Sequence, residues 1–410
     1  MERDFGLFWT GQVTSSAGSV FSAVALPLVA VQYLGASAVE TGLLAAASSI
    51  GLVLFGLPVG ALVDRLRRKR PVLIATDLIA AFALAAVAVL LATGAGGIAA
   101  LVALAMLLGV IGLFVEAAYF THLRSLVASD QLLTARSRLQ AGEYAGGVLG
   151  RVLVGPATAL AGVAAPFLVD AATYVVSACT LLAIKREERP DTEPEAARTG
   201  LAGIRDGVTA LTRDPFTRRV AVFLVLASAV SGMTGALTAP LLLRVLHIPS
   251  PWYGSLFLLI GVAGTAGSMV ASRLSKRLTA AQLCVLGFGC SVSAVVLLPL
   301  AAGPVWLAAG IAAVGIALPA FFGAISNVGF TAHITTQVPE NVLGRAVITL
   351  HISTAAATAV GALTAGVVAG AIGTRACLWV VVAVAAAAVV LLLSARRHVV
   401  DPAVPQEVHA

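Results

Sequence analysis

The residues best placed to carry chemistry are ionisable side chains inside otherwise apolar stretches of the chain. We single out Asp77, Glu116, Glu143, Arg151 and Asp170. A charge inside a hydrocarbon layer costs about 2.5–3.5 kcal/mol on insertion scales, so such residues usually have a function there. At ~1.5 Å per helical residue, Asp77 lies roughly 10 Å beyond Arg70. We take Asp77, Glu143, Arg151 and Asp170 as candidates for ion coupling.

Arg151 and Asp170 flank the short turn Ala161–Ala165 at comparable depth. A deeply buried charge needs a partner, so the two side chains are expected to pair across a helical hairpin. Buried pairs often have no coupling role, so a purely structural pair is an equal alternative. If Arg151 faces a central cavity instead, it would attract an anionic substrate or alter the titration of a nearby acid.

The elements that must position these side chains are membrane helices. Hydrophobic residues make up 59% of the 410 residues and charged residues 11%, whereas soluble chains carry about 25% charged residues. A spanning helix needs about 20 mostly apolar residues. Twelve stretches qualify: Phe5–Tyr33, Val39–Val63, Val72–Thr93, Ile98–Phe120, Leu139–Leu160, Pro166–Ile184, Val220–Leu246, Tyr253–Leu274, Ala280–Leu300, Val305–Phe330, Ala346–Ala371 and Ala376–Leu393. The prediction is an all-α protein whose twelve transmembrane helices contact a lipid bilayer.

Several function classes are disfavoured. The net charge of +7 comes from cations in interhelical turns, not on one basic face, so we predict no nucleic-acid partner. No CxxC pair or spaced histidine pair predicts a metal site, and His351 is best explained as a packed polar group. No phosphate-binding loop predicts ATP use. We expect no enzyme activity and no cofactor.

Basic residues predict the orientation. With the N-terminus inside, the cytoplasmic turns hold almost all Lys and Arg residues, and only Arg244 and Arg375 lie outside. Positive charge is retained in the cytoplasm during insertion, so both termini are predicted to be cytoplasmic. The first apolar run is too long and polar for a cleaved signal and is expected to remain as the first helix.

The chain divides into two six-helix halves. The predicted units are a bundle over 1–184, a cytoplasmic linker over 185–219, a second bundle over 220–394 and a tail over 395–410. Within the linker, Arg186–Gly200 has the composition of a flexible segment, and Leu201–Leu211 spaces its apolar residues as an amphipathic helix on the membrane surface. The basic turn Asp64–Lys69 recurs as Ser272–Arg277 at the same place in the second half, and two such halves are a transporter architecture. The second turn keeps the cations but has Ser272 in place of the acid.

The stretch that ends the second helix resembles motif A of the major facilitator superfamily, a Gly, three residues, Asp-Arg, then Gly and basic residues. The matching residues are Gly60, Asp64, Arg65, Arg68 and Lys69, with Arg67 where Gly is usual. The resemblance implies that Asp64 sits at the N-terminus of helix 11, near Arg345, and that Glu116 meets a basic residue of the motif. These contacts would close the cytoplasmic side and break on opening. A charge run that only sets topology explains the cations but not Asp64.

Further segments resemble the macrolide-efflux and enterobactin-exporter-like branch of that superfamily. They are Phe8–Gly18, Arg205–Gly207, Gln337–Glu340 and Gly344–Arg345. The Gly-rich fifth helix, ending in Gly155–Pro156, resembles the family's antiporter motif, although Arg151 occupies a position usually given to Gly. This implies proton antiport.

In this family helices 1, 4, 7 and 10 line the cavity, which gives a sparse set of polar candidates. These are Gln12, Ser15 and Ser16 of helix 1, Ser231 of helix 7 and Asn327 of helix 10. A mostly apolar cavity with hydroxyl and amide groups suits an amphiphilic organic substrate. We therefore expect a monomeric, proton-coupled exporter of small molecules such as antibiotics or secondary metabolites in the bacterial cytoplasmic membrane. A siderophore exporter is the alternative, and a membrane sensor or scaffold leaves the gate residues unexplained.

Overall fold

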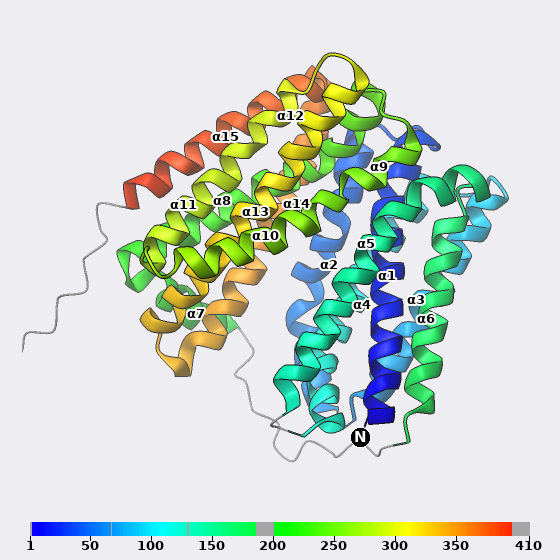
Figure 1. The fold of residues 1–410 in the computed structure, drawn as a ribbon, viewed down its shortest axis with the longest axis horizontal. Helices are drawn as coiled ribbons and strands as arrows, with labels where there is room; N and C mark the ends of the chain where they lie inside the picture. Colours follow the sequence, from blue (N-terminus) through cyan, green and yellow to red (C-terminus); the bar gives the residue numbers. More distant parts are fainter. Residues whose placement is uncertain (1, 67, 129–130, 186–200, 396–410) are drawn as a thin grey trace, which may run out of the picture.

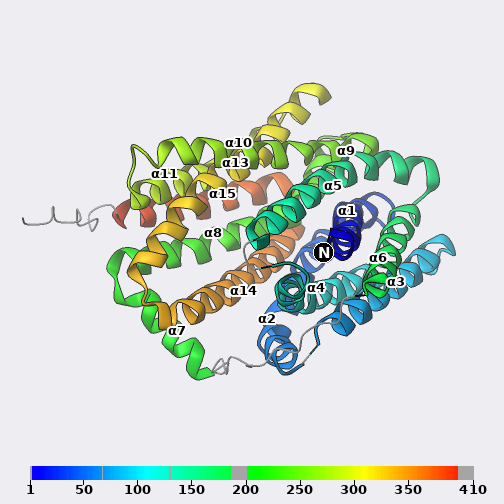
Figure 2. The same ribbon diagram turned by 60° about the horizontal axis from the view of Figure 1, so that its bottom comes forward.

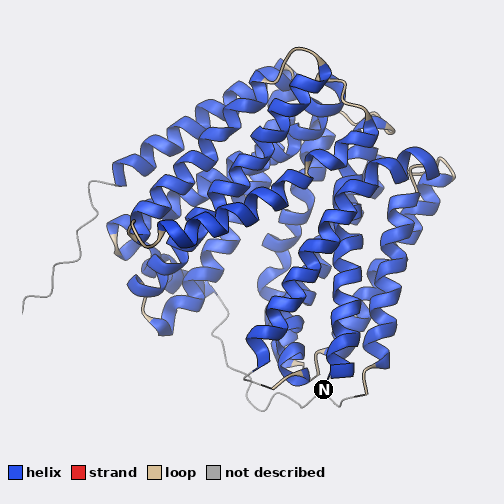
Figure 3. Ribbon diagram, viewed as in Figure 1, coloured by secondary structure: helices blue, strands red, loops and turns tan. Residues whose placement is uncertain are grey.

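The computed structural model describes residues 2–66, 68–128, 131–185 and 201–395, without the side chains of residues 2, 64, 120, 133, 201–204, 340, 341 and 395. Throughout these residues the chain is helical, and Figure 3 shows no strand in them. The linker segment Arg186–Gly200 and the tail after residue 395 lie outside the described residues.

The first six helices pack together around α1, as the colours of Figure 1 show. Their bounds are α1 Glu2–Gln32, α2 Ala38–Arg65, α3 Arg70–Ala92, α4 Ile98–Leu126, α5 Leu132–Ala161 and α6 Ala165–Ala183. Short turns join them, so neighbouring helices run antiparallel. Ser37 and Glu40 form a capping box at the start of α2, which fixes where this helix begins.

The remaining helices form the other half of the molecule. Their bounds are α7 Leu201–Arg213, α8 Pro215–Pro240, η2 Leu241–Val245, α9 Ser250–Leu256, α10 Leu258–Leu274, α11 Ala280–Ser293, η3 Ala294–Val296, α12 Leu297–Leu300, α13 Val305–Gln337, α14 Glu340–Ile372 and α15 Thr374–Ala395. Three stretches predicted as single helices are interrupted. The first passes from α8 into the π-helical segment η2, the second has a break at Phe257 between α9 and α10, and the third passes through the short 3-10 segment η3.

The number of apolar spans differs from the prediction. Eleven helical segments of the described chain are long and apolar enough to cross a membrane, and α5 is not among them. With its 30 residues α5 is long enough, but Arg136, Arg138, Glu143 and Arg151 make it too polar. It packs along α1 and against α9, while Tyr144, Leu149, Leu153 and Leu160 on its other face are exposed.

The predicted amphipathic helix exists as α7, but it packs on protein. Leu211 is buried in a cluster with Ile334, Val338 and Ala346. A Cβ at Gly207 would meet the backbone of Arg345, so the linker helix lies directly against the start of α14. The predicted helix therefore forms, and α14 and α8 cover its buried face; its place on the membrane surface stays a prediction.

The two halves meet at one end of the molecule. We call the end that carries the N-terminus and the turn between α2 and α3 the basic end. At the opposite end, α2 and α14 approach through glycines, since a Cβ at Gly42 would lie 2.7 Å from Ala362 O and 2.9 Å from Gly366 Cα. Arg244 also donates to Val31 O across the halves (3.0 Å). Small residues allow this close approach.

Toward the basic end the halves diverge. In both Figure 1 and Figure 2 the lower ends of α4 and α5 stand apart from α7 and the start of α14. The halves therefore contact each other at the end opposite the basic end, and their helices stand further apart at the basic end.

Candidate functional site

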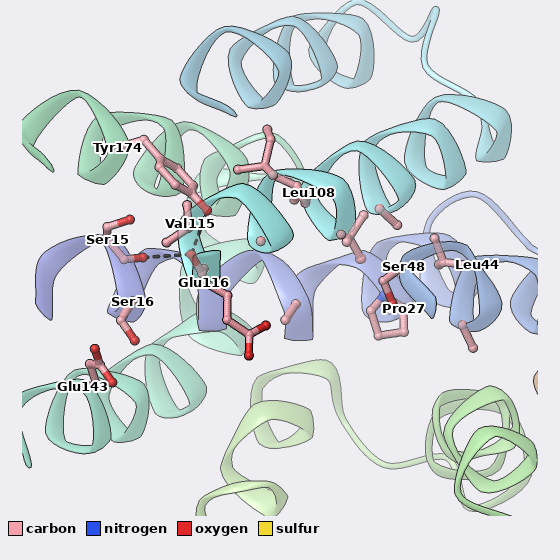
Figure 4. A pocket seen from close by; sticks show the side chains of 18 of the residues that line it. Ser15, Ser16, Pro27, Leu44, Ser48, Leu108, Val115, Glu116, Glu143 and Tyr174 are labelled. Atoms are coloured by element: carbon pink, nitrogen blue, oxygen red, sulfur yellow. Dashed lines mark hydrogen bonds between the residues drawn. The ribbon is translucent and has the colours of Figure 1, made fainter. Parts of the chain in front are cut away.

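A cavity of about 980 Å³ lies mainly in the first half, where α1, α2, α4 and α8 face one another. It extends from Pro27 and Thr41, near the opposite end, to Tyr119 and Arg136, near the basic end. Figure 4 shows its wall, with Ser15 and Ser16 on α1 and Ser48 on α2. The predicted cavity residues Gln12, Ser15 and Ser16 all line it.

Carboxyl groups from three helices reach this cavity. Glu116 of α4 and Glu143 of α5 extend into it (Figure 4), and Asp77 of α3 lies in its wall with 4% of its surface exposed. The hydroxyl of Tyr119 donates to Glu143 Oε1 at 3.4 Å. With Arg136, the wall holds three carboxyl groups and one guanidinium group.

A second cavity of about 440 Å³ lies in the other half and shares Gly235 of α8 with the first. Its wall includes Phe257, Phe288 and Pro319, and hydroxyl groups such as that of Ser231. The described lining contains no charged side chain. The combined space is therefore acidic on one side and apolar on the other.

The predicted gate residues are in different settings. The side chain of Asp64 is outside the described residues, while Arg65 and Arg68 are exposed and Gly60 is partly buried. Lys69 is 3% exposed and donates to Val63 O (2.7 Å) and Leu66 O (2.8 Å). Lys69 thus caps the C-terminus of α2, where a cation is favourable.

Arg345 and Glu116 have other surroundings in the described structure, and the predicted contact of Arg345 with Asp64 involves a side chain outside the described residues. Arg345 Nη1 donates to Asp206 Oδ2 of α7 at 2.7 Å. Glu116 forms no ion pair with a described motif residue and faces the cavity. Arg345 belongs to the half that stands apart from α2 at the basic end, whereas Glu116 and the motif lie in the same half.

Arg151 and Asp170 do not pair. Asp170 is fully buried and faces α1, where a Cβ at Gly18 would meet Thr173 and Asp170. The Arg151 guanidinium lies back along α5 beside Gly147. The prediction failed because equal depth in a hairpin does not fix the helix face on which each residue lies.

Comparison with known proteins fits this architecture. The sequence profile described as Major Facilitator Superfamily matches residues 8–328, most of the chain. The chain belongs to the Major Facilitator Superfamily. It is similar to the multidrug efflux pump Tap of Mycolicibacterium fortuitum, with 26% identity over 374 residues that cover 89% of this chain and 88% of that protein.

Solved transporters share the fold at low sequence identity. The nucleoside transporter NupG superposes with a TM-score of 0.74 at 11% identity, covering 97% of this chain and 99% of that one. A bacterial homologue of the iron transporter ferroportin, in an inward-facing state, gives 0.74 at 17% identity, covering 96% and 99%. A bacterial homologue of the human lysosomal transporter Spinster, inward-facing and unoccupied, gives 0.74 at 14%, covering 97% and 98%. This superfamily member is therefore a multi-pass membrane transporter and not an enzyme.

Other predicted residues of this superfamily member have clear positions. Gly155 packs against α9, since its Cβ would lie 2.6 Å from the backbone oxygens of Ser250 and Pro251, and Pro156 follows within α5. Ser231 lines the second cavity. Asn327 is exposed on α13 outside the lining of either cavity, and its Oδ1 accepts from Thr331 at 3.3 Å.

Sequence reasoning missed Tyr119, Arg136 and Tyr174 in the cavity wall, and the Asp206 partner of Arg345. Tyr174 carried a usable signal: together with Asp170, Thr173 and Ser177 it gives α6 polar residues at helical spacing. Asp206 carried none, because an ion pair between the linker and α14 joins positions 139 residues apart.

Proposed function

We propose that this transporter exports amphiphilic organic compounds across the bacterial cytoplasmic membrane in exchange for protons. The observation that carries the proposal is the divided cavity, acidic along the first half and apolar along the second. An apolar body with a basic group would find a matching surface on each side. Each chain holds both cavities, which supports action as a monomer.

The charge distribution supports a cytoplasmic location for the basic end. Under that orientation the structure is inward-open, with the α2–α14 contact closing the outer side. Arg244 and Arg375, the two outer cations among the described residues, donate to backbone oxygens of Val31 and Ala301. These hydrogen bonds explain why two arginines lie on the outer side although basic residues are usually retained in the cytoplasm.

The acidic wall favours positively charged compounds. Opposite charges attract more strongly in a site of low effective dielectric, and one guanidinium does not balance three carboxyl groups. The similarity to a multidrug efflux pump supports export. A siderophore exporter is less well supported, because an anionic iron chelator would meet the carboxyl groups Glu116 and Glu143.

We further propose that Arg345 changes partners during transport. In the inward-open state it is held by Asp206, and closure of the basic end would bring it to Asp64, as motif A implies. A gate of this kind needs two arrangements of similar free energy. The pair is partly exposed, which suits an exchangeable contact worth about 0.2–1 kcal/mol.

A matched pair of probes tests the substrate class. Tetraphenylphosphonium and tetraphenylborate have nearly the same size and shape but opposite charge. Protein in proteoliposomes is expected to transport the cation, and to do so faster with an imposed pH gradient. It is expected not to transport the anion. Glu116→Gln and Glu143→Gln should each lower cation transport severalfold.

Three outcomes bear on the proposal separately. Transport of the anion in preference to the cation would refute the assigned charge. Cation transport that ignores the pH gradient would refute proton coupling. Full cation transport by the Glu116→Gln, Glu143→Gln double variant would show that these two glutamates of the cavity wall do not take part in substrate recognition.

A further inference from the structure

A continuous set of polar side chains lies between α1, α3 and α6 and extends inward from the cavity wall. On α6 they recur every three or four residues and therefore share one face. We call this set the polar seam; it comprises Asp170, Thr173, Tyr174 and Ser177 of α6, Asp77 of α3, and Ser19 and Ser22 of α1. Gly18 of α1 admits α6 closely, since a Cβ there would meet Thr173 and Asp170.

The seam holds most of the unpartnered buried polar atoms of the described structure. Asp170, Ser177, Ser22 and Asp77 are 0, 0, 1 and 4% exposed. Their atoms Asp170 Oδ2, Ser177 Oγ, Ser22 Oγ and Asp77 Oδ2 are four of the six buried side-chain oxygens and nitrogens in the described residues that make no hydrogen bond. Ser22 lies beside Asp170, and Ser177 beside Asp77, short of hydrogen-bonding geometry. Buried polar atoms rarely lack a hydrogen bond, so four such atoms in one place need a functional or structural explanation.

No described cation compensates the two carboxyl groups. Neither Asp77 nor Asp170 forms an ion pair with a described Lys or Arg. The ionisable groups near them are Tyr174 on α6 and, across the cavity from Asp77, Glu116 and Tyr119 on α4 and Arg136 and Glu143 on α5. An ionised carboxylate would be costly at this depth without a partner, whereas a protonated carboxyl group would not.

A metal ion fits the seam less well than a proton. The described residues contain no group of three or more His, Cys, Asp or Glu side chains that could hold a metal. Hydroxyl groups, in contrast, can accept and donate a proton at once. Tyr174 Oη and Ser19 Oγ lie 3.0 Å apart, and Tyr174 is near both Asp77 and Asp170.

We propose that the polar seam binds the coupling proton, with Asp77 as the group that exchanges it with the cavity and Asp170 as the buried group that shares it. This inference rests on the proposed proton-coupled export. Asp77 lies in the cavity wall roughly 10 Å from the start of α3, and Asp170 lies roughly 7 Å from the start of α6 at the opposite end, at ~1.5 Å per residue. A proton leaves one carboxyl group, Tyr174 accepts it and donates its own hydroxyl proton, and the second carboxylate accepts that proton, while Ser19 holds the Tyr174 hydroxyl. The hydroxyl groups are unchanged at the end.

The test separates proton coupling from substrate exchange. Asp77→Asn, Asp170→Asn and Tyr174→Phe proteins are placed in proteoliposomes with tetraphenylphosphonium as the probe. Uptake driven by a pH gradient is compared with counterflow, in which labelled probe exchanges for unlabelled probe without net proton movement. The control is Glu40→Gln, which also replaces an acid by its amide and keeps the α2 capping box.

We expect both Asn variants to lose gradient-driven uptake at least tenfold. Counterflow should stay within twofold of the wild type in Asp170→Asn, which lies outside the cavity lining, and should fall less than driven uptake in Asp77→Asn, which lies in the cavity wall. Tyr174→Phe should reduce driven uptake less, and Glu40→Gln should reduce neither. Driven uptake within twofold of the wild type in both Asn variants would overturn the inference, and equal loss of counterflow would show a structural role instead. A wild-type protein that responds to a sodium gradient alone would overturn it too, whereas a wild type that transports no probe would refute the proposed function.

Discussion

Replacing Gly42 by Ala should favour the outward-open state, because this glycine lies where α2 and α14 must separate. The new Cβ would lie 2.7 Å from Ala362 O and 2.9 Å from Gly366 Cα, both backbone atoms. Ordinary contacts begin near 3.4 Å, so the helices must part by about 0.7 Å at this point. Overpacking of this kind costs about 1–3 kcal/mol. The strain exists only while the outer end is closed, so it should shift the conformational equilibrium about 5- to 150-fold.

Cross-linking across the same interface measures the shift. A Cβ at Gly370 would lie 3.7 Å from Val39 Cγ2, so Val39→Cys with Gly370→Cys should form a disulfide when the outer end is closed. The background lacks the accessible Cys179 and Cys290. Gly42→Ala should slow this cross-link at least fivefold.

A label and a control separate conformation from local damage. Ser48 lines the cavity, and Ser48→Cys should react faster with an impermeant maleimide added outside when residue 42 is Ala. Gly267→Ala also places a Cβ against backbone, at Phe321 O, but within one half, and should leave both rates unchanged. A folded Gly42→Ala protein with unchanged cross-linking and labelling would refute this account of the closed end.

Two further predictions concern contacts near the basic end. Asp206→Asn should free Arg345 from α7 and favour closure of this end by about 1.4- to 5-fold, because the ion pair is worth ~0.2–1 kcal/mol. Distances between spin labels on α2 and α14 measure this closure. Distances identical to those of the wild type would argue against the exchange of partners. Asp214→Ala should destabilise the protein by about 0.5–2 kcal/mol, because Asp214 Oδ2 caps α8 by accepting from Thr217 N (2.6 Å) and Oγ1 (2.8 Å). Thermal unfolding in detergent measures this loss, Asp214→Ser should retain most of the stability, and an unfolding temperature unaffected by Ala would show that the cap contributes nothing.

The sequence by itself determined the helices and the class of fold. Apolar stretches of about 20 residues have few alternatives to a spanning helix, because backbone groups in lipid must be satisfied within the segment. Helical spacing of apolar residues located α7, and the resemblance to the superfamily pointed to the polar residues of α1 that line the cavity. It overestimated the apolarity of α5, which carries Arg136, Arg138, Glu143 and Arg151.

Only the tertiary structure decided which polar groups meet. Asp170 faces α1 and does not contact Arg151, and Arg345 forms an ion pair with Asp206. These partners depend on the rotation of each helix about its axis, which is set by packing against the neighbouring helices. Depth along a helix can be counted from the sequence, but the partner on another helix cannot. The divided cavity and the polar seam exist through such contacts between distant segments, which is why residue types predicted a transporter and the fold was needed to propose how it works.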